Sequence, residues 1–234
     1  MDVNGILQAV AQQQGANVST GGQLRALRTT RVGQLLVADW RTELILAGAA
    51  FSVSVGDIVA GGDVALVTGG GAGSTIDSDQ PEMAVGTPTG FYHIPLGFDF
   101  EGQVDIDADL DEGNVILFAD TTQQIPLPII ASSTLETPAN LLGGGPAAVS
   151  WAQSVVTTNI TAPVGSIVLA YGTTQGSQVT AASYTLPKLQ CHWYPAFPML
   201  LKGPCSVVAC WGGTAAVLGM CSYYFAEVPL ARFQ

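Results

Sequence analysis

Residues 105–113 are the segment whose residue types and spacing most resemble those of a binding site. The segment reads Asp-Ile-Asp-Ala-Asp-Leu-Asp-Glu-Gly. Successive side chains of a β-strand point to opposite faces, so a strand here would carry four carboxylates on one face: Asp105, Asp107, Asp109 and Asp111. Clustered carboxylates bind hard cations, which favours a divalent-cation site, for instance for Ca²⁺ between subunits. The other interpretation is a solvated face whose charge prevents edge-to-edge aggregation.

This acidic segment is not an EF-hand loop. Counted from Asp105, the position that requires a turn glycine holds Leu110, and the position of the terminal glutamate holds Ile116. Both interpretations of the four aspartates therefore stay open, and apart from this Ca²⁺ hypothesis we expect no cofactor.

The cysteines and histidines contain the atoms of a zinc site but not its spacing. Two of the four cysteines are separated by four residues, and no Cys-x₂-Cys pair occurs. We interpret the four cysteines as small buried hydrophobic residues, and one disulfide among them remains an alternative. They are Cys191, Cys205, Cys210 and Cys221. His93 and His192 both stand in aromatic, strand-like contexts, with no motif that places a nucleophile or carboxylate beside them. We therefore expect a structural protein rather than an enzyme.

The first 38 residues differ from the rest and are expected to form an arm. Four apolar residues at helical spacing predict a short amphipathic helix that docks on another surface: Val3, Ile6, Leu7 and Val10. Three arginines follow at intervals of three: Arg25, Arg28 and Arg31. They favour either phosphate binding or docking of the arm against the acidic remainder of the chain.

The overall composition points to association with other chains. Charged residues make up 11% of the 234 residues, against about 25% in ordinary soluble domains. Mean hydropathy is +0.38, yet no apolar run approaches the roughly 20 residues of a spanning helix. We therefore expect a homo-oligomer that hides much of its surface in a large assembly. The net charge of −11 argues against strong direct binding of nucleic acid.

Residues 39–234 are expected to form one all-β domain. Short runs rich in Val, Thr and aromatic residues, separated by glycine and proline, predict about a dozen antiparallel strands: 43–47, 50–55, 63–68, 91–100, 103–110, 114–119, 149–160, 166–171, 180–186, 191–200, 205–211 and 219–228. Proline cannot donate to a ladder, so Pro95, Pro195 and Pro198 are expected at edges, bulges or corners. Two longer irregular stretches remain, near 70–90 and 120–148.

The C-terminal part of the chain resembles the last strand pair of jelly-roll virus capsid proteins. The resemblance rests on two segments of this sequence, Phe197–Trp211 and Gly219–Val228, and otherwise on the layout over residues 40–230. It implies an antiparallel β-sandwich of jelly-roll type, a location in the virion, and an icosahedral assembly with other virion proteins as further partners. Many RNA-virus coat proteins carry a strongly basic arm, and this chain does not.

The function expected from these features is that of a subunit of a self-assembling viral capsid or a similar closed shell. The alternative is a carbohydrate-binding or adhesive head of a phage fibre or appendage. Four aromatic residues are candidates for stacking on sugars: Trp151, Trp193, Tyr194 and Tyr223.

Overall fold

The computed structural model describes most of the chain from Trp40 onward. The described residues are 28–29, 35–36, 40–58, 64–69, 76, 80–104, 111–121, 134–154, 166–176, 188–214 and 216–233. The chain divides into two compact units, Met1–Glu43 and Leu44–Gln234. In the first unit, β1 (Arg28–Thr29) pairs antiparallel with β2 (Leu35–Leu36). The expected docking helix, Arg25 and Arg31 lie outside the described residues.

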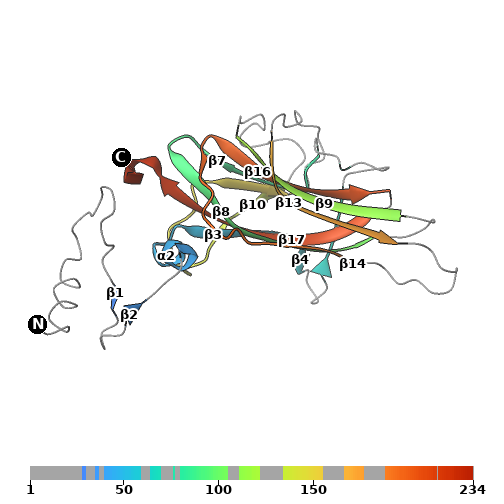
Figure 1. Ribbon diagram of the computed structural model, residues 1–234, viewed down its shortest axis with the longest axis horizontal. Coiled ribbons are helices and arrows are strands. Elements are labelled where there is room, and N and C mark those ends of the chain that lie inside the picture. Colours follow the sequence, from blue (N-terminus) through green and yellow to red (C-terminus); the bar gives the residue numbers. More distant parts are fainter. Residues whose placement is uncertain are drawn as a thin grey trace, which may run out of the picture. The chain divides into compact units, whose positions relative to one another are not determined.

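The second unit is an antiparallel β-sandwich of two sheets (Figure 1). The six-stranded sheet has the order β10 (Thr134–Glu136), β12 (Trp151–Ser154), β7 (Met83–Thr87), β16 (Cys205–Gly213), β9 (Asp111–Asp120) and β13 (Ile167–Gly176). The seven-stranded sheet has the path β11 (Ala139–Asn140), β3 (Ala50–Val55), β17 (Val217–Pro229), β8 (Phe91–Val104) and β14 (Lys188–Trp193), with β15 (Leu201–Lys202) beside β8 and β6 (Val67–Thr68) beside β17. A separate ribbon joins β4 (Asp57–Ile58) to β5 (Val64–Ala65), and a 3₁₀ turn covers Leu230–Phe233.

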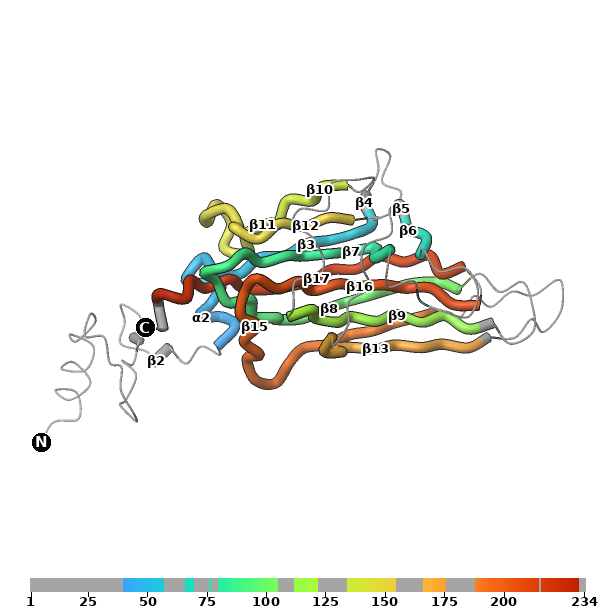
Figure 2. Tube along the Cα trace, turned by 90° about the horizontal axis from the view of Figure 1, so that it is seen from above, coloured from blue at the N-terminus to red at the C-terminus, as the bar shows by residue number. Residues whose placement is uncertain are grey.

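Eight strands form the centre of the two sheets. One group of four neighbours is β3–β17–β8–β14, and the other is β7–β16–β9–β13. Among these eight strands, every connection along the chain crosses to the other sheet except that from β9 to β13. Figure 2 shows the edge strands β10 and β13 on opposite sides of the sandwich.

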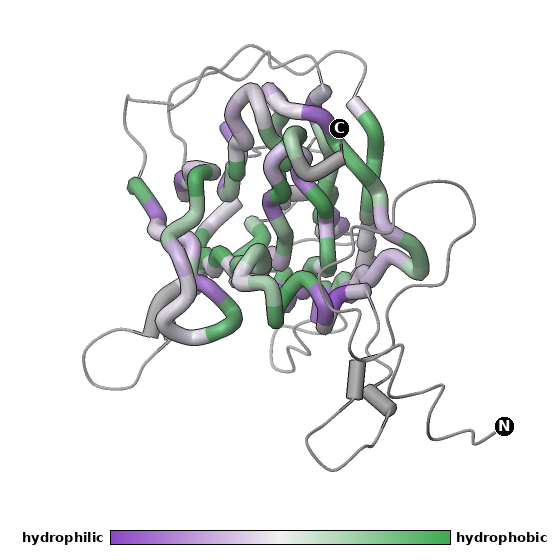
Figure 3. Tube along the Cα trace, turned by 90° about the vertical axis from the view of Figure 1, so that its left-hand side faces the viewer, coloured by the Kyte–Doolittle hydropathy of each residue, from purple (hydrophilic) through white to green (hydrophobic). Residues whose placement is uncertain are grey.

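The main core lies between the two sheets. Large side chains of the seven-stranded sheet, such as Phe98, Phe100 and Tyr223, pack with Leu117 and Trp211 of the six-stranded sheet. Polar and apolar residues succeed each other along the strands (Figure 3), as expected where one face is buried and the other solvated. A smaller cluster covers the opposite face of the six-stranded sheet: Ala84, Phe118, Val208 and Cys210.

A chain of hydrogen bonds runs through the buried space at one end of the sandwich. Tyr223 Oη lies 2.7 Å from His93 Nε2, and Thr87 Oγ1 lies 2.8 Å from His93 Nδ1. Thr87 Oγ1 is also 2.8 Å from Ser150 Oγ, which donates to Glu227 Oε2 at 2.6 Å. All five residues are buried. Because Thr87 belongs to the six-stranded sheet and His93, Tyr223 and Glu227 to the other, this chain ties the two sheets together.

The strand expected at 43–47 is wrong, because α2 (Trp40–Leu46) is a helix. Gly48 N donates to Ile45 O and Ala49 N to Leu44 O, and Gly48 has φ +67°. These two bonds are the Schellman motif that ends a helix at a left-handed glycine. The short apolar run Leu-Ile-Leu is compatible with either a strand or a helix. The following Gly48, a typical helix C-terminal residue, is the sequence signal that favours the helix.

Most of the other expected strands are confirmed, several of them with shifted ends. The runs 50–55, 205–211 and 219–228 correspond to β3, β16 and β17, and β8 continues to Val104, so no separate strand begins at 103. Pro95 lies beside a register shift against β17, as its missing donor requires. Residues 180–186 lie outside the described residues.

Three short strands lie in the stretches that looked irregular. They are β7, β10 and β11. β7 reads Met-Ala-Val-Gly-Thr and is buried along its whole length, so it shows no alternation, and Gly86 in its interior resembles a turn signal. The expected strand 191–200 ends at Trp193, before Pro195 and Pro198. Among the described residues, no helix is long and apolar enough to cross a membrane.

Candidate functional site: the outer face of the seven-stranded sheet

A row of polar side chains crosses four strands on the outer face of the seven-stranded sheet. Ser54 of β3 is paired in register with Ser222 of β17, Ser222 with Asp99 of β8, and Asp99 with His192 of β14. Residues on either side of each, such as Phe98 and Phe100, point into the core. Period-two alternation therefore places the four polar side chains together on the outer face. The two serine hydroxyls lie 3.0 Å apart.

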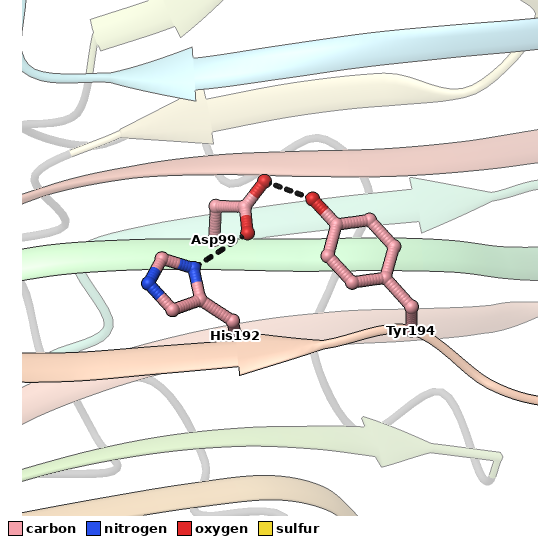
Figure 4. Close-up of polar contacts among 3 residues, drawn as sticks. All are labelled: Asp99, His192 and Tyr194. Atoms are coloured by element: carbon pink, nitrogen blue, oxygen red, sulfur yellow. Dashed lines mark hydrogen bonds and ion pairs between the residues drawn. The ribbon is translucent and has the colours of Figure 1, made fainter.

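Asp99 organises the end of this row. Its Oδ1 accepts a hydrogen bond from His192 Nδ1 at 2.8 Å, and its Oδ2 accepts one from the Tyr194 hydroxyl (Figure 4). The side chain of Asp99 is 28% exposed and that of His192 50%. Since Nδ1 faces the carboxylate, the imidazole turns Nε2 away from it. One carboxylate thus fixes two neighbouring rings.

The aromatic ring of Tyr194 lies against the backbone of β8 at Gly97. A Cβ atom at Gly97 would overlap ring atoms Cδ1 and Cε1 of Tyr194, so only glycine leaves room for the ring. Covering a strand glycine with a cross-strand aromatic ring is a known stabilising arrangement in sheets. Tyr194 remains 53% exposed. The ring is therefore held in place on its inner side and presented to solvent on the other.

Two hollows adjoin this row. The first, of about 420 Å³, is lined by Asp99, Glu101, His192, Met220, Cys221 and Ser222. The second, of about 130 Å³, shares Glu101 and Met220 with it and extends towards Leu66, Gln103, Lys188 and Gln190. Together they make one shallow groove over β17, β8 and β14, which we call the outer groove.

The outer groove offers hydrogen-bonding chemistry on a rigid base. Its polar groups are two carboxylates, two amides, an imidazole, an ammonium and a hydroxyl, all carried by strands. Among the described residues, the imidazole of His192 makes its hydrogen bond with Asp99, and no nucleophile is in hydrogen-bond contact with it. Among the same residues, no three carboxylate, thiol or imidazole groups come together in a way that would hold a metal ion. The arrangement is suited to binding through hydrogen bonds and one aromatic face.

The structure leaves most of the sites expected from the sequence undescribed. Of the aspartate stripe, residues 105–110 lie outside the described residues, and Asp111 is the first residue of β9. The docking residues of the arm, Val3, Ile6, Leu7 and Val10, also lie outside them. Arg28 is described only as part of β1. These sites stay predictions.

The cysteines are free and buried, as interpreted from the sequence. Cys205 belongs to the core between the sheets, and Cys210 to the cluster on the other face of the same strand. Burial raises the pKa of the Cys205 thiol to about 12, with Asp120 adding to the effect. Such thiols are protonated and chemically inert at neutral pH.

Sequence reasoning missed the pairing of His192 with Asp99. The two residues are 93 positions apart, and their contact depends on the register of β14 against β8, which no local motif encodes. Of the four aromatic residues considered for stacking, Tyr223 is fully buried and is therefore unavailable to a ligand. Trp151 and Trp193 are partly buried against the two core clusters. Tyr194 alone of the four is largely exposed.

No protein-family model, curated protein or solved structure matches this chain.

Proposed function

We propose that the chain is a jelly-roll subunit of a self-assembling closed protein shell, a viral capsid, and that it resides in the virion. The observation that carries the proposal is the order of the eight central strands. With these strands named in chain order from first to eighth, one sheet has the order first, eighth, third, sixth and the other second, seventh, fourth, fifth. Two four-stranded sheets related by Greek-key crossings are the arrangement of jelly rolls, which occur in viral capsids and lectins.

The two edges of the sandwich supply surfaces on which subunits would pack side by side. One edge carries Leu135 of β10, which is 68% exposed. The opposite edge carries Val168 of β13, with Phe197, 73% exposed, in the segment after the edge strand β14. Because the two edges differ, a contact between them is heterologous, and such contacts generate rings and larger assemblies instead of ending at a dimer.

Composition supports the same proposal. A chain with 11% charged residues and large exposed apolar side chains at its edges has a surface suited to burial against neighbours. Summed over neighbours, the buried area of a subunit is expected to exceed about 1,600 Å². The proposed function is therefore structural, as a building block of the shell, and not catalytic.

A carbohydrate-binding or adhesive head is the second candidate. The observation that favours it is the exposed Tyr194 ring beside Asp99 and His192. Fold alone does not decide between the two, since lectins also use jelly rolls. The size of the native assembly separates them, because a shell subunit forms large closed particles and an adhesive head forms a small oligomer.

The test is electron microscopy and sedimentation velocity of the purified full-length chain, alone and with the other proteins of its native particle. Closed particles of uniform size are the expected result. A stable, monodisperse monomer or small oligomer at high concentration near neutral pH in both preparations would overturn the shell proposal.

A further inference from the structure

The Tyr194 ring has the properties of a platform for a flat ligand. Its hydroxyl is held by Asp99, and its inner face rests on β8 at Gly97 (Figure 4). An aromatic ring fixed before binding loses little side-chain entropy when a ligand stacks on it. Its exposed face offers apolar contact, while Asp99 and His192 at its rim offer hydrogen bonds.

The polar groups beside the platform match a ligand rich in hydroxyl groups. A hydroxyl both donates and accepts. Asp99 Oδ1 and Oδ2 accept, and in the neutral tautomer that donates to Asp99 through Nδ1, His192 Nε2 also accepts. Gln103 and Gln190, further along the outer groove, each supply an amide that does both. An apolar ligand would displace water from these groups without replacing the hydrogen bonds that the water makes.

The charge of the groove excludes anionic ligands. Asp99 and Glu101 stand on the same face of β8, two residues apart, and Lys188 is the one cation among the groove-lining residues described. The chain as a whole carries −11. A phosphate, a sulfated chain or a nucleic acid would meet a repulsive field. A neutral ligand with one apolar ring face and many hydroxyls fits both the aromatic ring and the hydrogen-bonding groups of the groove.

From these observations we propose that the outer groove binds a neutral oligosaccharide. One pyranose ring stacks on Tyr194, its hydroxyls bond to Asp99 and His192, and the following sugar units lie along β8 towards Gln103 and Gln190. The proposal names the ligand class of the second candidate function and rests on it, and it does not depend on shell assembly. Asp99 and Gly97 act as positioning residues for the Tyr194 ring, and Asp99 also lines the site.

The experiment is saturation-transfer NMR and calorimetric titration of the full chain. The probes are maltotetraose, cellotetraose, mannotetraose and N-acetyllactosamine, each at up to about 10 mM, which detects millimolar affinity. Dextran sulfate serves as the anionic probe. We expect binding of at least one neutral saccharide and none of dextran sulfate.

Three variants locate the site. Tyr194→Ala removes the platform and is expected to weaken binding about tenfold or more. Gly97→Ala keeps the tyrosine but displaces its ring, so it should weaken binding similarly, whereas Tyr194→Phe keeps the ring and should lose less. The matched control is Tyr171→Ala, which removes a tyrosine of similar exposure, 57%, on β13.

Several results would overturn the proposal. They are the absence of binding for all four saccharides, binding that survives Tyr194→Ala, an equal loss in Tyr171→Ala, or tighter binding of dextran sulfate. Circular dichroism of each variant confirms that the sandwich is folded. Failure of particle assembly would bear on the shell proposal alone, because the groove lies within one chain.

Discussion

Tyr223 donates its hydroxyl proton to Nε2 of His93 across 2.7 Å, and residues at the far end of the buried chain fix this direction. Ser150 donates its one hydroxyl proton to Glu227. Thr87 must therefore donate to Ser150, and His93 Nδ1–H must donate to Thr87. In a neutral imidazole the other nitrogen then accepts. The network is satisfied only while His93 is neutral.

The first prediction is that His93 makes the protein sensitive to acid. Burial lowers the pKa of His93 from 6.5 to about 3. Between these two values the unfolded chain binds a proton that the folded chain does not, so the free energy of unfolding falls as pH falls. Its slope from this residue is about 1.4 kcal/mol per pH unit well inside the window. Above pH 6.5 and below about 3 the contribution is flat.

Chemical denaturation at pH 7, 6, 5 and 4 measures this slope. His93→Gln is expected to be less stable at pH 7, because it loses the stacking on Phe225 at 4.9 Å, but to show a shallower decline towards pH 4. The control is Phe225→Leu, which removes the same stacking contact but keeps His93, and should keep the slope of the wild type. Equal slopes in the wild type and His93→Gln would contradict the assignment.

The second prediction concerns the thiols. All four cysteines are free and buried, and burial raises the pKa of Cys191, Cys205 and Cys221. We expect negligible reaction of the native protein with a thiol reagent such as Ellman's reagent at pH 8 over minutes, and four equivalents after denaturation without reductant. Two equivalents after denaturation would mean that one disulfide had formed.

The sequence predicted the fold where a strand has one buried and one solvated face. β3 alternates in this way, and its limits were predicted as observed. β7 is buried on both faces, so it has no alternation of polar and apolar residues by which to predict it. The run of three apolar residues in α2 is too short to show a helical or a strand periodicity, so it does not distinguish the helix from a strand. The polar site could not be predicted from local sequence patterns either. Asp99 and His192 come into contact only through the register of β14 against β8, and no spacing in the sequence indicates this register.

The third prediction is that charge at either edge of the sandwich prevents assembly without unfolding the subunit. Val168→Asp and Leu135→Asp each place a carboxylate on an exposed apolar position. Surface substitutions of this kind usually change stability by about 0.5 kcal/mol or less, while a buried unpaired charge in a contact costs several kcal/mol. Sedimentation velocity should show dissociated subunits for both variants.

Gln103→Asp is the matched control for the edge variants. It adds the same charge at an exposed position on the outer face of the seven-stranded sheet, on β8, one strand in from the edge strand β14. We expect particles of normal size from this variant. Intact particles from Val168→Asp and Leu135→Asp would mean that subunits meet through other surfaces.

The fourth prediction concerns the arm. Because the β-sandwich lies within Leu44–Gln234, deletion of residues 1–20 should leave its melting temperature within a few degrees of the full chain, and should impair assembly. Replacing Ile6 and Leu7 by Ser is the finer variant, since it removes apolar surface from the expected helix and keeps its length. A truncated chain that fails to fold would show that the segment belongs to the core.

The last prediction tests the two interpretations of the aspartate stripe. On the strand that the sequence predicts, the four carboxylates would lie on one face and repel one another, so they would need water, a cation or an arginine from another subunit beside them. If they bind a divalent cation between subunits, a chelator should loosen the particles and Ca²⁺ should restore them, whereas Asp107→Asn with Asp109→Asn should abolish this dependence and leave the fold intact. Light scattering with and without chelator, at pH 7 and pH 5, measures both. Particles that resist chelator, acid and the double substitution alike would identify the stripe as a solvated face whose charge only keeps strands apart.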